Sequence, residues 1–407
     1  MPKAYVIVGA SLAGASAAIT LREAEPAATV TLIGAEEEAP YERPPLSKSY
    51  LRGDVPFEKA LVRPRGFYAD HGIRTLFGSR VVRVVPAGRR VELEDGSRQT
   101  FDALLIAMGA KNRRLSVPGV DLDGVYSLRT VKDADRIRAE MIAGRRAVVV
   151  GMGFIGSEVT ASLRQSGVEV IAIDPSKTPL LRVLGEPIGQ AIAHLHESHG
   201  VRTVFEDTVS AFDGDGRVRS VVTQKGRRFD CDFVVVGVGV EPAVEMLADS
   251  GIRLENGILV DEYCQTSVSG VHAAGDVANH YHPIFGRHIR VEHWQNAIKQ
   301  GAAAARTMLG QRVAYDDVPW FWSDQYDANV QYAGFLTNWD GLAVRGRPDS
   351  GAFLVCYLRE GRIDAVAGFN RAKDVRRAMP LIKSRTIVDR ASLEDEHVDL
   401  RSLAPPP

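Results

Sequence analysis

Two glycine-rich segments carry the most specific chemistry in this 407-residue sequence. Each follows a short apolar run and precedes a helix-like segment, which predicts a strand, a turn and a helix. In such a turn, main-chain N–H groups and the helix N-terminus face a pyrophosphate, and glycines stand where a Cβ would block the turn or the ligand. An acidic residue at the tip of the next strand then accepts hydrogen bonds from ribose hydroxyls. The two segments therefore predict two dinucleotide-binding sites.

The second segment matches this pattern fully. Its predicted nucleotide-binding residues are Gly151, Gly153, Ile155 and Gly156. Asp174 directly follows the next predicted strand, where its charge would repel a 2′-phosphate, and it therefore favours NADH over NADPH. Lys177 and Arg182 lie nearby in the sequence and leave NADPH open.

The first segment departs from the pattern at one position. Its predicted nucleotide-binding residues are Gly9, Ser11, Ala13 and Gly14. Ser11 replaces the middle glycine, which brings a Cβ toward the phosphate but adds a hydroxyl donor. Glu36 lies 22 residues after Gly14, beyond the next predicted strand, and is the candidate ribose acid.

Composition excludes several classes of function. Hydrophobic content is 45%, charged content is 25%, and the formal charge is −1, so nothing favours nucleic acid or an anionic membrane as a partner. The three cysteines lie far apart and form no dithiol motif, which favours a reducing, cytoplasmic location. The apolar run over residues 4–21 resembles a signal peptide, but its glycines and β-branched residues favour a buried strand and turn. Nothing demands more than a monomer, and the oligomeric state stays open.

The elements that position these sites recur along the chain. Predicted strands at Tyr5–Val8 and Thr29–Ile33 flank the first turn, and strands at Ala147–Val150 and Glu169–Ile173 flank the second. Two such βαβ units predict two Rossmann-like domains with parallel sheets. The expected division is a first domain in two parts (1–110 and 241–318), a second domain (111–240) and a C-terminal α+β domain (319–407).

Further strands and a helix complete the prediction. Strands are expected within Arg80–Leu93, at Ala103–Ile106, Phe233–Val236, Val330–Leu336, Gly341–Val344, Ala352–Leu358 and Ile363–Phe369, and a helix at Asp374–Lys383. The tail from Leu393 lacks periodicity, and we expect it to be loose.

Six motifs occur in an order that resembles a known family. They are Glu42-Arg-Pro-Pro-Leu-Ser-Lys48, Ala107-Met-Gly-Ala110, Gly151-Met-Gly-Phe-Ile-Gly-Ser-Glu158, Gly237-Val-Gly-Val-Glu-Pro242, Gly275-Asp-Val-Ala278 and Pro319-Trp-Phe-Trp-Ser-Asp-Gln325. Together they resemble the FAD-dependent ferredoxin reductases that serve bacterial cytochrome P450 and ring-hydroxylating dioxygenase systems. That resemblance implies the α/β fold of glutathione-reductase-like flavoproteins.

The resemblance also implies roles for residues outside the glycine turns. Lys48 and Glu158 are the implied catalytic pair, with the ammonium group beside the flavin and the carboxylate near the nicotinamide. A fixed cation there would stabilise negative charge on the reduced ring. The further implied cofactor-binding residues are Arg43, Pro45, Val81, Arg129, Gly239, Glu241, Asp276, His293, Trp294 and Trp320. Trp322 is expected to join Trp320 on the electron exit path.

The implied activity is an NADH-dependent reduction of FAD, followed by single-electron transfer to a [2Fe–2S] ferredoxin. Rubredoxin, another acceptor, or a redox-switch role like that of apoptosis-inducing factor are the alternatives. No cysteine lies near residues 40–50, where disulfide-reducing relatives carry their thiols, so a cysteine mechanism is excluded.

Two clusters complete the candidate sites. An acidic ferredoxin would need a basic dock, for which the candidates are Arg63, Arg65, Arg345, Arg347, Arg371, Arg376 and Arg377. The histidines His194, His196 and His199 do not share one helical face, so we expect a solvated helix surface and no metal site.

Overall fold

Short apolar segments form the central strands of two parallel sheets. In strand β1 (Ala4–Val8), Tyr5 and Ile7 are buried in one hydrophobic cluster, whereas Val6 and Val8 are buried in another. A strand that is covered on both faces is apolar throughout instead of alternating with polar residues. This explains why the sequence shows a continuous apolar run here.

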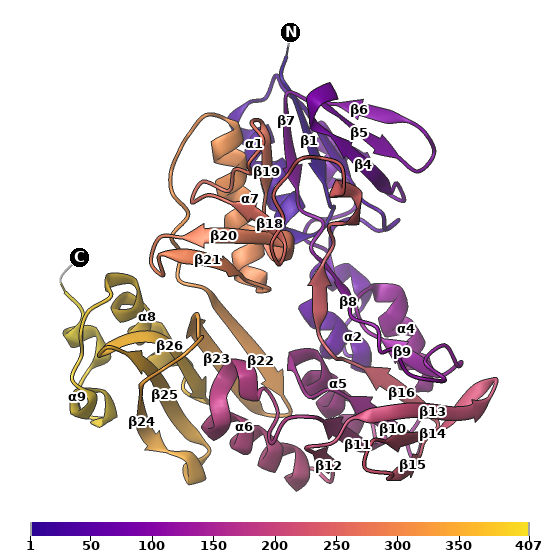
Figure 1. Cartoon of the computed structure of the whole chain (residues 1–407), viewed down its shortest axis with the longest axis vertical. Helices are drawn as coiled ribbons and strands as arrows, with labels where there is room; N and C mark the ends of the chain where they lie inside the picture. The colour runs from indigo at the N-terminus through magenta and orange to yellow at the C-terminus, as the bar shows by residue number, and fades with distance from the viewer. Residues whose placement is uncertain (1, 406–407) are drawn as a thin grey trace. The chain divides into compact units, whose positions relative to one another are not determined.

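The computed structural model describes residues 2–405. The chain divides into two compact units (Figure 1). Unit 1 contains the chain up to Glu42 together with Phe57–Lys111 and Glu241–Pro319. Unit 2 contains Arg43–Pro56, Asn112–Val240 and the chain from Trp320.

Unit 1 is built on a parallel sheet with the strand order β19-β7-β1-β2-β3. The other strands of this sheet are β2 (Thr29–Ile33), β3 (Ile73–Leu76), β7 (Ala103–Ile106) and β19 (Val271–Ala273). Helices α1 (Leu12–Ala24) and α7 (Trp294–Met308) pack together closely. A Cβ on Gly301 would lie 2.2 Å from the carbonyl oxygen of Ala13, so only glycine allows this approach. The Ala-rich face of α1 makes this approach possible.

Smaller elements complete unit 1. They are α3 (Phe67–Asp70), β4 (Val81–Val85), β5 (Arg90–Leu93), β6 (Arg98–Thr100), β18 (Ile258–Val260), the 3₁₀ turn η5 (Gly275–Val277), β20 (Ala278–His282) and β21 (Arg287–Arg290). Strands β4, β5 and β6 form an antiparallel sheet, and their apolar residues cover the sheet face opposite to α1.

Unit 2 repeats this plan with the strand order β12-β11-β10-β16-β9. Its parallel strands are β9 (Val125–Ser127), β10 (Arg146–Val150), β11 (Glu169–Asp174), β12 (Arg202–Phe205) and β16 (Phe233–Val236). The antiparallel strands are β13 (Val209–Asp215), β14 (Arg217–Thr223) and β15 (Arg228–Asp230). The helices are α2 (Ser49–Arg52), α4 (Val131–Glu140), α5 (Phe154–Gln165) and α6 (Leu181–Ser198). Strands β8 (Ala110–Asn112) and β17 (Val240–Pro242) lie where the chain passes from one unit to the other.

The C-terminal part of unit 2 is an antiparallel sheet with helices packed on it (Figure 1). It contains β22 (Trp320–Gln325), β23 (Ala328–Gly334), β24 (Gly341–Arg347), β25 (Ala352–Arg359), β26 (Arg362–Phe369), α8 (Ala372–Ser384) and α9 (Arg390–Glu394). Apolar residues of α6, among them Leu184, Ile188 and Ile192, are buried in the same cluster as residues of this sheet. Two Rossmann-like domains and a C-terminal α+β domain confirm the predicted fold class.

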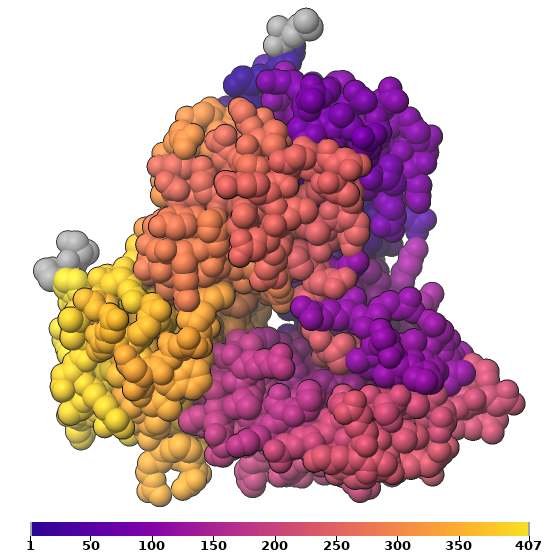
Figure 2. All heavy atoms as spheres, viewed as in Figure 1, coloured from indigo at the N-terminus to yellow at the C-terminus, as the bar shows by residue number. Residues whose placement is uncertain are grey.

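The prediction of a loose tail from Leu393 is wrong for residues 393–405, and residues 406–407 lie outside the described chain. Leu393 and Leu400 are buried, and Arg345 ties the segment down by donating to the carbonyl oxygens of Asp395 (2.6 Å) and Val398 (2.7 Å). Figure 2 shows these yellow residues continuous with the orange surface of the sheet. A few contacts with distant residues hold this segment in place, and such contacts leave no periodic pattern in the sequence.

Candidate cofactor and nucleotide site

The first glycine turn leads from β1 into α1. Gly9 has a φ of 116°, and a Cβ there would lie 2.2 Å from the carbonyl oxygen of Ala107. A Cβ on Gly14 would lie 1.9 Å from the carbonyl oxygen of Gly9. Real Cβ atoms do not approach oxygen so closely, so both positions require glycine. The turn is therefore held against β7 and against its own helix.

The start of α1 suits an anion. Ser11 is the N-cap, and its side chain forms no capping hydrogen bond within the described chain. The first turn of the helix, Leu12 to Ala15, carries no acidic side chain. Main-chain N–H groups at a helix start carry partial positive charge and need an acceptor. A pyrophosphate supplies that acceptor, so this turn fits a dinucleotide.

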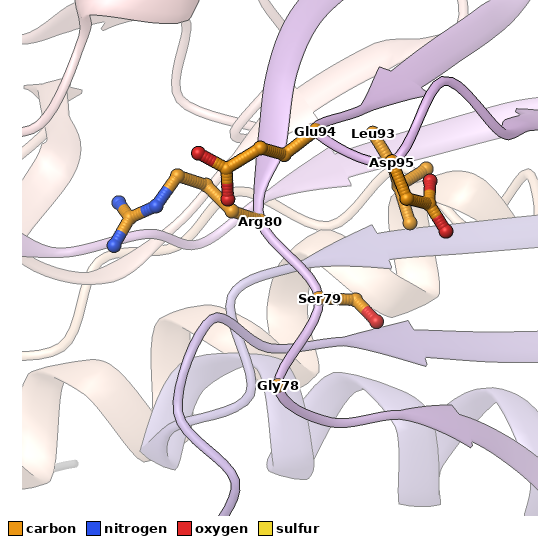
Figure 3. A pocket seen from close by; sticks show the side chains of 6 residues that line it. All are labelled: Gly78, Ser79, Arg80, Leu93, Glu94 and Asp95. Carbon is orange, nitrogen blue, oxygen red and sulfur yellow. The ribbon is translucent and has the colours of Figure 1, made fainter.

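The predicted ribose acid, Glu36, is hydrogen-bonded to a residue that lines a pocket in unit 1. The Tyr41 hydroxyl donates to Glu36, and the main-chain carbonyl oxygen of Glu36 accepts from Gly78 N–H at 2.8 Å. The pocket that begins at Gly78 has a volume of about 240 Å³ and is lined by Gly78, Ser79, Arg80, Leu93, Glu94 and Asp95. Figure 3 shows Arg80 and Glu94 extending to one side of it. Val81 follows directly at the start of β4.

Asp276 lies close to the first glycine turn. It belongs to η5, whose first residue, Gly275, would place a Cβ 3.1 Å from the Cβ of Ala13. The Gly275 N–H donates to the Gln300 side chain of α7 at 2.8 Å. The structure therefore brings Asp276 and the predicted pyrophosphate loop together.

The start of α7 places His293 and Trp294 in unit 1. His293 is the N-cap of the helix and Trp294 its first residue. Burial raises the pKa of the Glu42 carboxyl, although a hydrogen bond from Trp294 opposes that effect. The Oε1 atom of Gln295 is buried and has no hydrogen-bond partner among the described residues. A buried acceptor without a donor fits a ligand that supplies one, as the pyrimidine edge of a flavin does.

The second glycine turn, between β10 and α5, repeats the first. Gly151 has a φ of 93°, and a Cβ there would lie 2.4 Å from the carbonyl oxygen of Gly237. A Cβ on Gly156 would lie 1.8 Å from the carbonyl oxygen of Gly151. At Gly153, the N-cap of α5, no described atom lies within 4 Å of the Cβ position, and Ile155 is 41% exposed. This turn also fits a pyrophosphate.

Asp174 is buried and tied to the second turn. One carboxylate oxygen accepts from the main-chain N–H of Met152 at 2.6 Å, and the other accepts from Ser176 N–H at 2.8 Å. Met152 lies between Gly151 and Gly153, so the acid and the turn form one hydrogen-bonded unit. Each oxygen keeps further lone pairs for ribose hydroxyls.

Lys48 and Glu158 form a largely buried ion pair within unit 2. The Lys48 Nζ lies 2.7 Å from Glu158 Oε2, and the Ser47 hydroxyl donates to the same oxygen. Ser323 of β22 donates to Glu158 Oε1 at 2.8 Å. Glu158 is the fifth residue of α5, beyond the first turn, so the helix dipole does not explain its position. The structure thus brings the two predicted catalytic residues together.

Other predicted residues of unit 2 contact one another in pairs. The Arg43 guanidinium donates to the carbonyl oxygen of Arg129, and the Pro45 carbonyl oxygen accepts from Lys48 N–H at 3.0 Å. Trp320 and Trp322 stack with their ring centres 5.5 Å apart.

Gly239 and Glu241 lie on the return segment of the chain. The carbonyl oxygen of Gly239 accepts from Arg113 N–H at 3.0 Å. The Glu241 carboxylate is paired with Lys111 at 3.0 Å, and Lys111 also pairs with Glu245. Glu241 therefore has a basic partner of its own, and its predicted cofactor contact stays a prediction.

Comparison with known proteins places the chain. The pattern described as pyridine nucleotide-disulphide oxidoreductase matches residues 3–301, and the pattern described as reductase C-terminal matches residues 320–404. The chain belongs to the pyridine nucleotide-disulphide oxidoreductase family.

Three relatives of this oxidoreductase match along their whole length. One is the ferredoxin reductase subunit of 5,5′-dehydrodivanillate O-demethylase from a Sphingobium strain, with 39% identity over 98% of this chain and 97% of the relative. Another is the ferredoxin–NAD(+) reductase component of the anthranilate 1,2-dioxygenase system from Burkholderia cepacia, with 40% identity over 98% of both chains. The covalent putidaredoxin reductase–putidaredoxin complex contains a solved chain with a TM-score of 0.95, 32% identity and 98% coverage of both chains.

Two predictions about surface clusters are wrong. His196 of the oxidoreductase is fully buried, not part of a solvated helix face, although His194 and His199 are exposed. Arg345 is 4% exposed and holds the tail, so it cannot contribute to a basic dock.

In residues 2–405, no group of His, Cys, Asp and Glu has the geometry of a metal site, and no helix has the length and apolarity that crossing a bilayer requires.

Two polar residues beside Glu158 were not predicted from the sequence. Ser47 and Ser323 both donate to its carboxylate, and they belong to the motifs Glu42–Lys48 and Pro319–Gln325. Their signal was therefore present as a serine inside an ordered motif. What was lacking was the knowledge that β22 packs against α5, which tertiary structure alone supplies.

Proposed function

We propose that this oxidoreductase is an NADH-dependent ferredoxin reductase, with FAD bound through unit 1 and NADH bound through unit 2. FAD, when bound, takes up two electrons from NADH and releases them one at a time, which suits a [2Fe–2S] ferredoxin. The ferredoxin reductases among its full-length relatives support this acceptor and a role beside an oxygenase.

The observation that carries the proposal is the buried pair of Lys48 and Glu158. A lysine that is 14% exposed and held 2.7 Å from a carboxylate is a fixed positive charge in a low-dielectric place. We assign Lys48 the role of stabilising negative charge on the reduced cofactor. Glu158 holds the ammonium in place, and Ser47 helps to hold Glu158.

Asp174 supports NADH as the nucleotide. Its carboxylate is fixed by two main-chain N–H groups, so it cannot move away from a bound 2′-phosphate without breaking both hydrogen bonds. The negative charges of the Asp174 carboxylate and of a 2′-phosphate bound beside it would repel each other. Ribose hydroxyls, in contrast, would donate to the carboxylate.

The acceptor surface has fewer candidates than the sequence indicated. Arg63, Arg347 and Arg376 are exposed. Arg65 is also exposed, but it is paired with Glu38 at 2.7 Å. Arg371 is paired with Asp374 at 3.3 Å and with Glu396, which offsets its charge. We therefore propose that Arg63, Arg347 and Arg376, rather than the paired Arg65 and Arg371, attract an acidic ferredoxin.

Lys48→Ala in the FAD-loaded protein is the test of this function. We expect the limiting rate of flavin reduction by NADH in a stopped-flow experiment to fall about 100-fold, while the protein stays yellow. Lys373→Ala, at an exposed lysine of α8, is the matched control and should leave the rate unchanged.

Wild-type protein should also reduce an added [2Fe–2S] ferredoxin faster than it reduces oxygen. An unchanged reduction rate in Lys48→Ala would remove the role of that lysine. A wild-type protein that stays colourless after reconstitution with FAD would remove the whole proposal.

A further inference from the structure

A chain of hydrogen bonds runs from Glu158 through unit 2 to Tyr326. Ser323 Oγ donates to Glu158 Oε1 at 2.8 Å, and Gln325 Nε2 donates to Ser323 Oγ at 3.2 Å. His196 Nε2 lies 3.0 Å from Gln325 Oε1, and His196 Nδ1 lies 3.1 Å from the Tyr326 hydroxyl. The chain of hydrogen bonds links α5 and α6 to β22, which lies more than 100 residues further along the sequence.

The donors in this chain all point toward Glu158. A carboxylate oxygen only accepts, so the Ser323 hydroxyl must donate to it. The amide oxygen of Gln325 also only accepts, so His196 must carry its proton on Nε2. Nδ1 of His196 then accepts from the Tyr326 hydroxyl. The acceptor-only carboxylate of Glu158 therefore fixes the direction of every hydrogen bond in the chain, including the Nε2–H tautomer of His196.

The chain is shielded from water. Ser323, Gln325 and His196 are fully buried, and Glu158 is 4% exposed. Burial lowers the pKa of His196 to about 4, so the ring is neutral at physiological pH and has one N–H to donate. The Tyr326 ring packs edge-on to His196 and stacks on His199 with ring centres 3.7 Å apart. Ring contacts thus hold the outer end of the chain.

Apolar side chains would fill this space at lower cost, because buried polar groups lose hydration. The chain therefore has to be explained by the group on which it ends. At the Glu158 end, Lys48 and Ser47 both bind Oε2. Among the described residues, Ser323 alone donates a hydrogen bond to Oε1. Without Ser323, Oε1 would be a buried acceptor with no donor.

We propose that Ser323, Gln325 and His196 are positioning residues that hold Oε1 of Glu158 away from Lys48, so that the lysine ammonium stays available to the cofactor. This inference rests on the proposed function, because it assigns Lys48 a cofactor to serve. A carboxylate that lost its donor on Oε1 could turn and bind the ammonium with both oxygens. The cation would then be offset by Glu158 before the cofactor gained charge.

The first experiment examines the chain directly in the FAD-loaded full-length protein. With ¹⁵N-labelled histidine, the NMR signals of His196 should show a protonated Nε2 and an unprotonated Nδ1 from pH 7 to pH 5. Gln325→Leu should abolish that preference for Nε2–H. A protonated Nδ1, or a cationic His196 at pH 6, would overturn the inference.

The second experiment measures flavin reduction by NADH in a stopped-flow apparatus. Ser323→Ala should lower the limiting rate about 10-fold, as the loss of a hydrogen bond to a charged group predicts, with the dissociation constant of NADH unchanged. Ser323→Thr keeps the hydroxyl and should recover most of the rate. Ser220→Ala is the matched control, because Ser220 of β14 is equally buried and its hydroxyl has no partner among the described residues.

The outcomes separate the two proposals. Wild-type protein that binds FAD but is not reduced by NADH would defeat the proposed function, and this inference with it. Active wild-type protein with equal rates in Ser323→Ala and Ser220→Ala would defeat the inference alone. A rate loss that Ser323→Thr does not recover would show that packing matters at Ser323 and not its hydroxyl, and would also defeat it.

Discussion

The two glycine turns have the same backbone and different acids. In each, a Cβ on the first glycine would meet a carbonyl oxygen of a neighbouring segment, and a Cβ on the last would meet that of the first. In unit 2, the Asp174 carboxylate binds the turn itself through Met152 N–H. In unit 1, Glu36 accepts instead from a side chain, the Tyr41 hydroxyl.

The difference between the acids suits two kinds of ligand. Asp174 is fixed by main-chain N–H groups and the space at Gly153 is open, so the second turn is formed before any nucleotide arrives. Preformed sites cost little ordering on each binding event, which favours a substrate that comes and goes. The first turn is closed in by η5 and α7 as well, through Gly275 and Gly301 against Ala13, which favours a resident cofactor.

The largest expected effect comes from substituting the last glycine of each turn, which should abolish the binding of a different ligand in each case. Gly14→Ala and Gly156→Ala each place a Cβ within 2 Å of a carbonyl oxygen, so each should disrupt its own turn at a cost of about 3 kcal/mol or more. Gly14→Ala should yield protein without bound flavin. Gly156→Ala should stay yellow but lose reduction by NADH. Absorbance at the flavin band and NADH titration measure both outcomes.

Gly216→Ala is the matched control for both variants. Gly216 also has a positive φ, of 68°, but no described atom lies within 4 Å of its Cβ position. It should keep both flavin and NADH. If Gly14→Ala retained FAD at wild-type affinity, the assignment of the first turn to the flavin nucleotide would be wrong.

Acid should weaken unit 1 more than unit 2 through buried histidines. Burial lowers the pKa of His272 to about 4 and that of His280 to about 3, both in unit 1, against about 4 for His196 in unit 2. Their folded pKa values lie below the unfolded value of 6.5, so the stability they contribute is complete above pH 6.5 and declines as the pH falls toward 4. At pH 5 each costs about 2 kcal/mol.

Urea unfolding at pH 7 and pH 5 measures this effect. His280→Gln should reduce the loss of unfolding free energy between the two pH values by about 2 kcal/mol. His194→Gln, at an exposed histidine of α6, should leave the loss as it is in wild type. Equal losses in both variants would show that His280 is not neutral in the folded protein.

The repeated strand and turn patterns could be predicted from the sequence, whereas the contacts between residues distant in sequence could not. Both glycine turns, the strands beside them and the C-terminal strands were predicted from local patterns, because strand periodicity and turn chemistry act over a few residues. His196 and Arg345 were predicted to lie on the surface because their residue types usually do. Each is buried by partners more than forty residues away, Gln325 for His196 and Asp395 for Arg345, which no local pattern encodes.

Of the two acids, Asp174 should determine the preference between NADH and NADPH, and Glu36 should not. Asp174→Ala should lower kcat/KM for NADH about 10-fold and raise that for NADPH, because the repelling charge and the ribose acceptor are lost together. Asp174→Asn removes the charge and keeps an oxygen for Met152 N–H, but its amide nitrogen cannot accept from Ser176 N–H. It should therefore accept NADPH, with a loss toward NADH between those of the wild type and Asp174→Ala. Steady-state kinetics with both nucleotides measures this.

Glu36→Ala is the counterpart in the first turn. It should weaken FAD binding and leave the ratio of NADH to NADPH activity unchanged. A changed ratio in Glu36→Ala would mean that the two acids do not serve separate ligands. Equal use of NADH and NADPH by the wild-type protein would show that Asp174 does not set the preference.

The smallest effect is expected where the two turns differ in their middle residue. Gly153→Ser gives the second turn the residue of the first, and its Cβ would enter space in which no described atom lies within 4 Å. The protein should fold as before, because Gly153 has an extended φ of −72° that serine adopts freely. The added Cβ and hydroxyl would reach only the bound nucleotide, so the dissociation constant of NADH should change about three-fold or less. Ser11→Gly, the reverse exchange, should change FAD affinity as little. A change of more than ten-fold in either variant would mean that this position contacts the pyrophosphate directly and decides which dinucleotide each turn accepts.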